Sequence, residues 1–140
     1  MNPHYNQNYT REQIDAILNK IKSCVEYNRY TIALNENRQG NIDFIKEYNI
    51  HSNKQKTILR QLQTEDFCHT LQNTKTGYEY EVLYVFVPQV QLFNIDGKEE
   101  TVDVYTKFNV IEMPNGSRTV VVSFHKRNKP IDYLFRHVGN

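Results

Sequence analysis

The sequence lacks several features that would point to particular protein classes. It has no tryptophan and two cysteines, Cys24 and Cys68, which stand far apart and form no CxxC motif. We therefore expect neither a disulfide framework nor a zinc site, but two buried free thiols. No apolar run is long enough to span a membrane, and the first residues, MNPHYNQNYTR, lack the apolar segment of a secretory signal. These absences predict a cytoplasmic protein that has no membrane partner.

Neither sign of charge is in excess. The 140 residues carry 17 Lys and Arg against 16 Asp and Glu, a formal net charge of +1. Such a chain has no overall basic field for nucleic acid, so binding of that kind requires a local patch. Apolar residues make up 39% of the chain, less than in most soluble domains, which favours one thin core over a large enzyme fold. The abundance of asparagine, with many lysines, isoleucines and tyrosines, is typical of low-GC bacteria, their plasmids and their phages.

The first half of the chain has mainly helical patterns. Residues 1–9 show no periodicity, and we expect them to form a flexible arm. Thr10 and Gln13 form a capping box, and apolar residues at helical spacing then predict a helix to about residue 27. Further along we expect a strand at residues 30–34, a helix capped by Asn41, a helix capped by Ser52 and a helical turn over residues 68–71.

From Tyr78 onward the apolar spacing changes to two, which is typical of strands. One long strand is predicted over residues 80–92, with Pro88 at an edge or a bulge. Strands over residues 102–110 and 120–124 complete a three-strand meander. The predicted fold class is α+β, with N-terminal helices packed on a small antiparallel sheet. The chain then has three parts: the arm at residues 1–9, one domain at 10–130 and a C-terminal tail at 131–140.

The turn between the last two strands decides which side chains lie opposite one another. A two-residue turn at Asn115-Gly116 would set Val110 opposite Val121, which places a core residue against an outward one. A three-residue loop over residues 114–116 instead pairs Val110 with Val120, so that both lie on the core side. We therefore favour the three-residue loop.

This register gathers chemically active side chains on the face away from the core. Tyr105 lies opposite His125, and Lys107 lies opposite Ser123, with Cβ atoms about 4.5–5.5 Å apart. A basic run follows directly: Lys126, Arg127 and Lys129. A solvated polar face is the alternative interpretation. However, a base, an acid and nearby cations are the groups that RNA cleavage without a metal requires.

Other chemistries find little support in the sequence. The five histidines show no metal-ligand spacing, and no nucleotide-binding or GxSxG motif occurs. Cys68 and His69 are neighbours in the chain, and neighbouring side chains on a helix rarely face each other. We therefore expect no metal and no cofactor.

Four short segments together resemble the MqsR family, RelE-like mRNA interferases that are the toxins of type II toxin–antitoxin systems. The segments are LQTEDFCHT at residues 62–70, VFVP at 85–88, VYTKF at 104–108 and VVSFHK at 121–126. The similarity spans about residues 30–126. It implies a RelE/MqsR-like fold and a metal-independent endoribonuclease that cleaves single-stranded mRNA, free or on the ribosome, through attack of the 2′-hydroxyl. It also implies a cognate antitoxin protein as a partner.

The resemblance assigns roles to individual residues. The family's catalytic tyrosine falls on Tyr105, and two of its basic residues, usually lysines, fall on His69 and His125. Histidine titrates near 6.5, closer to neutrality than lysine. We therefore expect the two histidines to transfer protons, either one as the base, with Tyr105 orienting them or sharing that task. The residues expected to bind RNA are Lys107, Ser123, Lys126, Arg127 and Lys129.

The same comparison supports an alternative function. The position of the family's catalytic glutamine holds Leu83 here, and the net charge is near zero where family members are strongly basic. Both departures favour a non-catalytic inhibitor or binding protein of a phage or mobile element that uses the same scaffold. A small regulatory RNA-binding module is a third hypothesis.

Overall fold

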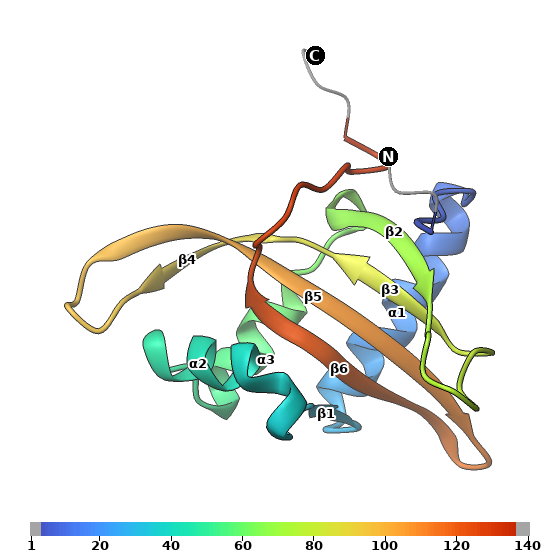
Figure 1. Cartoon of the computed structure of the whole chain (residues 1–140), viewed down its shortest axis with the longest axis horizontal. Helices are drawn as coiled ribbons and strands as arrows, with labels where there is room; N and C mark the ends of the chain where they lie inside the picture. Colours follow the sequence, from blue (N-terminus) through green and yellow to red (C-terminus); the bar gives the residue numbers. More distant parts are fainter. Residues whose placement is uncertain (1–3, 137–140) are drawn as a thin grey trace.

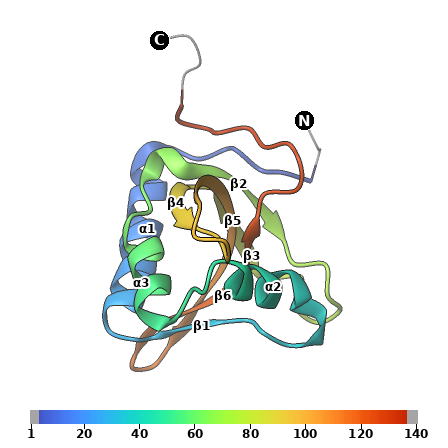
Figure 2. The same ribbon diagram turned by 90° about the vertical axis from the view of Figure 1, so that its left-hand side faces the viewer.

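Helices cover one face of a mixed six-stranded sheet in the computed structural model, which describes residues 4–136 (Figure 1, Figure 2). The helices are α1 (Arg11–Glu26), α2 (Gln39–Glu47) and α3 (Ser52–Arg60), with 3₁₀ turns at Glu36–Arg38 and Thr64–Asp66. The strands are β1 (Tyr30–Ile32), β2 (Phe67–Gln72), β3 (Val82–Phe86), β4 (Gln89–Phe93), β5 (Glu99–Met113) and β6 (Gly116–Lys126). The α+β class is confirmed for this part of the chain.

The sheet has the strand order β1-β6-β5-β3-β2, and β4 pairs with β5. The sheet has more strands than expected. It is also mixed, because β1 pairs parallel with β6 while the other pairs are antiparallel. The predicted small antiparallel sheet is therefore wrong in this respect. The predicted meander corresponds to β3–β6, since the long strand expected over residues 80–92 is divided at Val87-Pro88 into β3 and β4. None of the helices in residues 4–136 is both long and apolar enough to cross a membrane.

Helix α1 begins as predicted. The Gln13 backbone N–H donates to the Thr10 hydroxyl at 3.2 Å, and the Thr10 N–H donates to the Gln13 side chain at 2.8 Å. The apolar stripe of the helix is buried against the sheet and α3; its fully buried residues include Ile14 and Ile21. This reciprocal cap pairs two donors that a helix start otherwise leaves open.

Asn41 does not cap α2 as expected. It lies inside the helix and is buried, and its amide donates to the carbonyls of Ala33 (2.9 Å) and Val122 (3.1 Å). Its carbonyl accepts from the Phe124 N–H at 2.8 Å. The amide thus pairs the edge of β6 just beyond the end of β1, a long-range role that the local sequence does not encode. Similarly, Ser52 is the first residue of α3 rather than its cap.

Residues 68–71 form part of β2, not the predicted helical turn. Both faces of this strand are buried: Phe67 belongs to the main core, and Cys68 belongs to a smaller cluster on the opposite face. Pairing with β3 supplies the backbone hydrogen bonds. Both cysteines are buried free thiols, as predicted.

The turn between β5 and β6 differs from the expected one. Met113 lies opposite Gly116, so the loop has two residues, and Val110 lies opposite Thr119 rather than Val120. A register shift follows further along, between Phe108 and Lys107, where Val122 has no partner on β5. This bulge restores the predicted pairing for the residues beyond it.

Two terminal segments cover the face of the sheet that the helices leave open. Within the segment expected as a flexible arm, Asn6 forms a β-bridge with Thr70 of β2. From the other end of the chain, Ile131 and Tyr133 pack on the smaller cluster of Cys68, Val85, Val87 and Tyr105. Residues 1–3 of the arm and 137–140 of the tail lie outside the described residues.

Candidate functional site

The residues predicted for catalysis share the face of the sheet that the helices leave open. His69, Val85, Lys107 and Ser123 lie in register across β2, β3, β5 and β6. Tyr105 lies opposite His125 in a row two residues further along β5. The predicted pairs Tyr105–His125 and Lys107–Ser123 are therefore confirmed.

Beside this face lies a groove of about 890 Å³, here called the Lys107 groove. Three cations from three separate segments line it: Lys107 from β5, Arg38 from the 3₁₀ turn before α2, and Lys129 from the segment after β6. Tyr5 forms part of its wall, and Glu79 is the one acid among its described lining residues. The groove thus carries a local positive charge on a chain whose overall charge is near zero.

The surroundings of the groove bring the pKa of Lys107 close to neutral pH. Burial, and then the nearby cations of Arg38 and Lys129, lower the pKa of its ammonium from 10.5 to about 8. A lysine with this pKa exchanges protons near neutral pH, which an ordinary lysine does not. Lys107 therefore combines the charge of a phosphate ligand with the titration behaviour of a general base.

Tyr105 and His125 form a stacked pair. Their ring centroids lie 5.3 Å apart with the planes at 14°, and the Lys129 ammonium lies 5.0 Å from the centroid of the Tyr105 ring. The Tyr105 hydroxyl is buried without a hydrogen-bond partner among the described residues, and burial raises its pKa far above the usual range. Tyr105 is thus a support for the His125 ring and not a group that titrates near neutrality.

His125 is half-buried and lines a small hollow of about 240 Å³ together with Gly40 of α2. Its Nδ1 lies 2.8 Å from the carbonyl of Lys126. Because a carbonyl oxygen only accepts, this contact assigns the proton to Nδ1 and leaves Nε2 as the nitrogen for proton exchange.

His69 occupies a different environment. It is 1% exposed, and the Tyr5 ring covers it at a centroid distance of 3.7 Å and an angle of 6°. Burial, together with the cations of Lys129 and Lys107, lowers its pKa to about 4, so it is uncharged at neutral pH. Strands β3 and β5 separate it from β6, which puts its backbone roughly 14 Å from the strand that carries His125. The structure therefore does not bring the two histidines together as an exposed pair.

Two predicted RNA-binding residues are engaged elsewhere. Lys126 lies on the helical side of the sheet, because successive residues of a strand point to opposite faces. Its ammonium lies 2.7 Å from the Glu47 carboxylate and 5.0 Å from the centroid of the Tyr48 ring. Arg127 is paired with Asp103 at 3.1 Å. Ser123 is buried beside Lys107. Of the five predicted residues, Lys107 and Lys129 line the groove.

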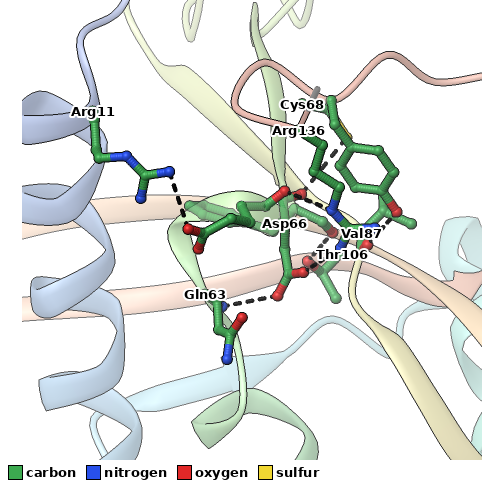
Figure 3. A network of polar contacts seen from close by, with 10 residues as sticks. Arg11, Gln63, Asp66, Cys68, Val87, Thr106 and Arg136 are labelled. Atoms are coloured by element: carbon green, nitrogen blue, oxygen red, sulfur yellow. Dashed lines mark hydrogen bonds and ion pairs between the residues drawn. The ribbon is translucent and has the colours of Figure 1, made fainter. Parts of the chain in front are cut away.

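Sequence reasoning missed Tyr5 and Arg38, which come from segments without periodic patterns. It also missed how the C-terminal segment is held (Figure 3). The Arg136 guanidinium donates to Asp66 at 2.7 Å, and the Tyr133 hydroxyl donates to the Val87 carbonyl at 2.7 Å. These bonds fix the segment that carries Lys129 against the sheet.

Comparison with known proteins adds no relative. No protein-family model matches the chain, and no curated protein or solved structure is significantly similar to it. Among residues 4–136, no group of three or more His, Cys, Asp or Glu side chains is arranged to hold a metal ion. The function must therefore be inferred from the groove itself.

Proposed function

We propose that the protein is a metal-independent endoribonuclease that binds single-stranded RNA in the Lys107 groove. The observation that carries this proposal is the convergence of Arg38, Lys107 and Lys129 on one groove. Cations placed in this way attract the phosphates of a nucleic-acid backbone. Lys107 lies on the sheet face that also carries His125, and Lys129 lies 5.0 Å from the centroid of the Tyr105 ring that stacks on His125, so phosphate binding and proton transfer are available side by side.

The reaction needs two proton transfers. The 2′-oxygen attacks the adjacent phosphorus and the bond from phosphorus to the 5′-oxygen breaks, which leaves a 2′,3′-cyclic phosphate and a 5′-hydroxyl. Lys107 takes the proton of the 2′-hydroxyl. Its pKa of about 8 leaves about a tenth of the amine uncharged at pH 7, roughly 300-fold more than in an ordinary lysine.

In its imidazolium form, which carries a proton on Nε2 as well as on Nδ1, His125 gives the Nε2 proton to the departing 5′-oxygen and is left as the neutral Nδ1–H tautomer. It lies diagonally across from Lys107 on the neighbouring strand, a relation in which Cβ atoms are about 7–8 Å apart and long side chains reach a common atom. Arg38 and Lys129 hold the charge that develops on the phosphate. In this arrangement Tyr105 supports His125, and His69 supports the groove wall instead of transferring protons.

Cleavage of a single-stranded RNA in the presence of EDTA tests the proposal. We expect products with 5′-hydroxyl ends, and a 10²- to 10⁴-fold slower reaction, roughly, for Lys107→Ala and for His125→Ala. Lys46→Ala removes an exposed lysine of α2 on the other side of the sheet and is expected to cleave like the wild type. Absence of cleavage both of free RNA and of mRNA on translating ribosomes would contradict the catalytic proposal.

A second candidate is a binding protein without catalysis. The observation that favours it is that Leu83 lines the groove where the MqsR family has a glutamine, while His69 and Tyr105 are buried. Such a protein would bind RNA, or a partner rich in phosphate or carboxylate, and release it unchanged. Wild-type protein that binds RNA tightly and leaves it intact identifies this function.

We further propose that the enzyme is an MqsR-like mRNA interferase of a bacterial toxin–antitoxin system, with an antitoxin protein as its partner. The proposal is supported by the motifs named above and by the pairing of Tyr105 with His125. Growth arrest on induction, relieved by Lys107→Ala or by co-expression of a protein encoded next to it, tests this assignment.

A further inference from the structure

The wall of the Lys107 groove contains an aromatic ring held in a fixed position. Tyr5 lies flat on the buried His69 ring, at 3.7 Å and 6°. The next residue, Asn6, exchanges two backbone hydrogen bonds of 2.9 Å with Thr70 of β2. Gln7 donates to two backbone carbonyls, at 2.9 Å and 3.0 Å. The segment thus presents Tyr5 with one face packed and the ring bordering the groove.

The layer beneath this ring is suited to stacking and not to charge. Burial lowers the pKa of His69 to about 4, so an uncharged imidazole lies under Tyr5 at neutral pH. Around the ring, Arg38, Lys107 and Lys129 line the same groove. A flat aromatic ring next to cations is the combination that binds single-stranded nucleic acid, because the base stacks on the ring and the cations hold the phosphates.

We propose that the groove face of Tyr5 is a stacking platform for one unpaired nucleobase of single-stranded RNA, whose neighbouring phosphates are bound by Arg38 and Lys129. This inference rests on the proposed RNA-binding function and adds a base subsite to it. Because every base has an aromatic face, the platform fixes the position of the strand with little preference for sequence. It thereby holds an adjacent phosphate near Lys107.

The absence of tryptophan in the chain makes a direct test available. Tyr5→Trp introduces a single indole at the platform, whose fluorescence is expected to be quenched when a base stacks on it. The ligand is a labelled 2′-O-methyl RNA oligonucleotide, which lacks the attacking hydroxyl and stays intact, and its binding is followed by anisotropy. An oligonucleotide with the same phosphates but abasic sugars is expected to leave the indole unquenched. Tyr27→Trp, at the exposed C-terminal end of α1, is the matched control and is expected to show no quenching.

Affinity supplies the second arm of the test. Tyr5→Ala is expected to weaken binding of the oligonucleotide roughly 5- to 150-fold, while Tyr5→Phe, which keeps the ring, binds like the wild type. Unchanged affinity of Tyr5→Ala, or binding of Tyr5→Trp without quenching, would overturn the platform and leave RNA binding by the groove intact. If the oligonucleotide binds none of the proteins, both the platform and the proposed RNA-binding function are wrong.

Discussion

The pKa of Lys107 gives the sharpest test of the electrostatics of the groove. Burial is the largest cause of its low value of about 8, and the cations of Arg38 and Lys129 are the next two. We predict that the double variant Arg38→Gln/Lys129→Gln raises this pKa, because it removes two positive charges that disfavour the ammonium form. Glutamine keeps a polar side chain at each position, so the change is mainly one of charge.

The size of the expected change is bounded by the order of these causes. The fall from 10.5 to about 8 corresponds to roughly 3 kcal/mol. Since burial contributes most, removal of the two cations reverses only part of this fall. The titration midpoint of Lys107 in the double variant therefore moves upward but stays below the ordinary lysine value, and it moves less in Arg38→Gln alone.

The same shift has a defined sign for stability. Folded Lys107 loses its proton near pH 8, whereas the unfolded chain keeps it to about 10.5, so the folded state binds fewer protons between these values. The contribution of this group to the free energy of unfolding therefore rises as the pH increases from about 8 to 10.5. In the double variant this rise is smaller, because the folded pKa lies closer to the unfolded one.

A side-chain NMR titration of protein labelled at lysine measures the midpoint directly, and the signal that disappears in Lys107→Arg identifies the residue. Lys54→Gln, at an exposed position of α3, is the control and is expected to leave the midpoint unchanged. A wild-type midpoint in the ordinary lysine range would refute the burial argument. An unchanged midpoint in the double variant would show that Arg38 and Lys129 do not act on Lys107. The pH–rate profile of RNA cleavage is expected to rise toward pH 8 and to move with the same midpoint.

Three further predictions concern the scaffold. Asn41→Ala breaks the three hydrogen bonds of a buried amide and is expected to lower the free energy of unfolding by about 2–4 kcal/mol in urea denaturation, against less than about 0.5 for Asn19→Ala on the exposed side of α1. Arg136→Ala leaves the buried Asp66 carboxylate without its cation, and we expect a loss of roughly 1–3 kcal/mol and faster proteolysis of the C-terminal segment. Gly40→Ala is expected to stabilise α2 by roughly 0.5–1 kcal/mol in thermal melts, since the added methyl meets the His125 ring at an ordinary 3.8 Å.

Patterns that depend on near neighbours in the chain predicted the fold well. The capping box at Thr10 and the helical spacing after it gave the start and the buried face of α1. The alternation of apolar and polar residues predicted the core face of β5, where Val102, Val104 and Phe108 are buried. In each case the signal lies within a few residues of the feature it determines, so one sequence is enough to read it.

Features that depend on distant partners were predicted poorly. Residues 68–71 resemble a helical turn locally, and pairing with β3 makes them a strand. Histidine is a common catalytic residue type, but the position of His69 beneath Tyr5 depends on a segment more than 60 residues away in the chain. The backbone hydrogen bonds between Asn6 and Thr70 hold that segment in place. Arg38 reaches the groove because α2, the helix that follows it, packs on β6. No local pattern in the sequence predicts this packing. The strand pairing of the predicted site residues could therefore be read from the sequence, whereas the burial of His69 and the positions of Tyr5 and Arg38 could not.

The pairing of the site residues was predicted correctly from a turn that is wrong, and the reason lies in β6. Between the two-residue turn and Phe108, each residue of β5 pairs one residue away from its predicted partner on β6. Val122 has no partner on β5, and from Lys107 onward the pairs are again the predicted ones. Asn41 donates to the carbonyl of Val122 and accepts from the N–H of Phe124, so α2 fixes the strand at the bulge. A bulge left unsupported could move along the strand, and each residue of slip would turn the side chains to the opposite face. The position of Lys107 in the groove therefore depends on the packing of α2 against β6 more than on the hairpin turn.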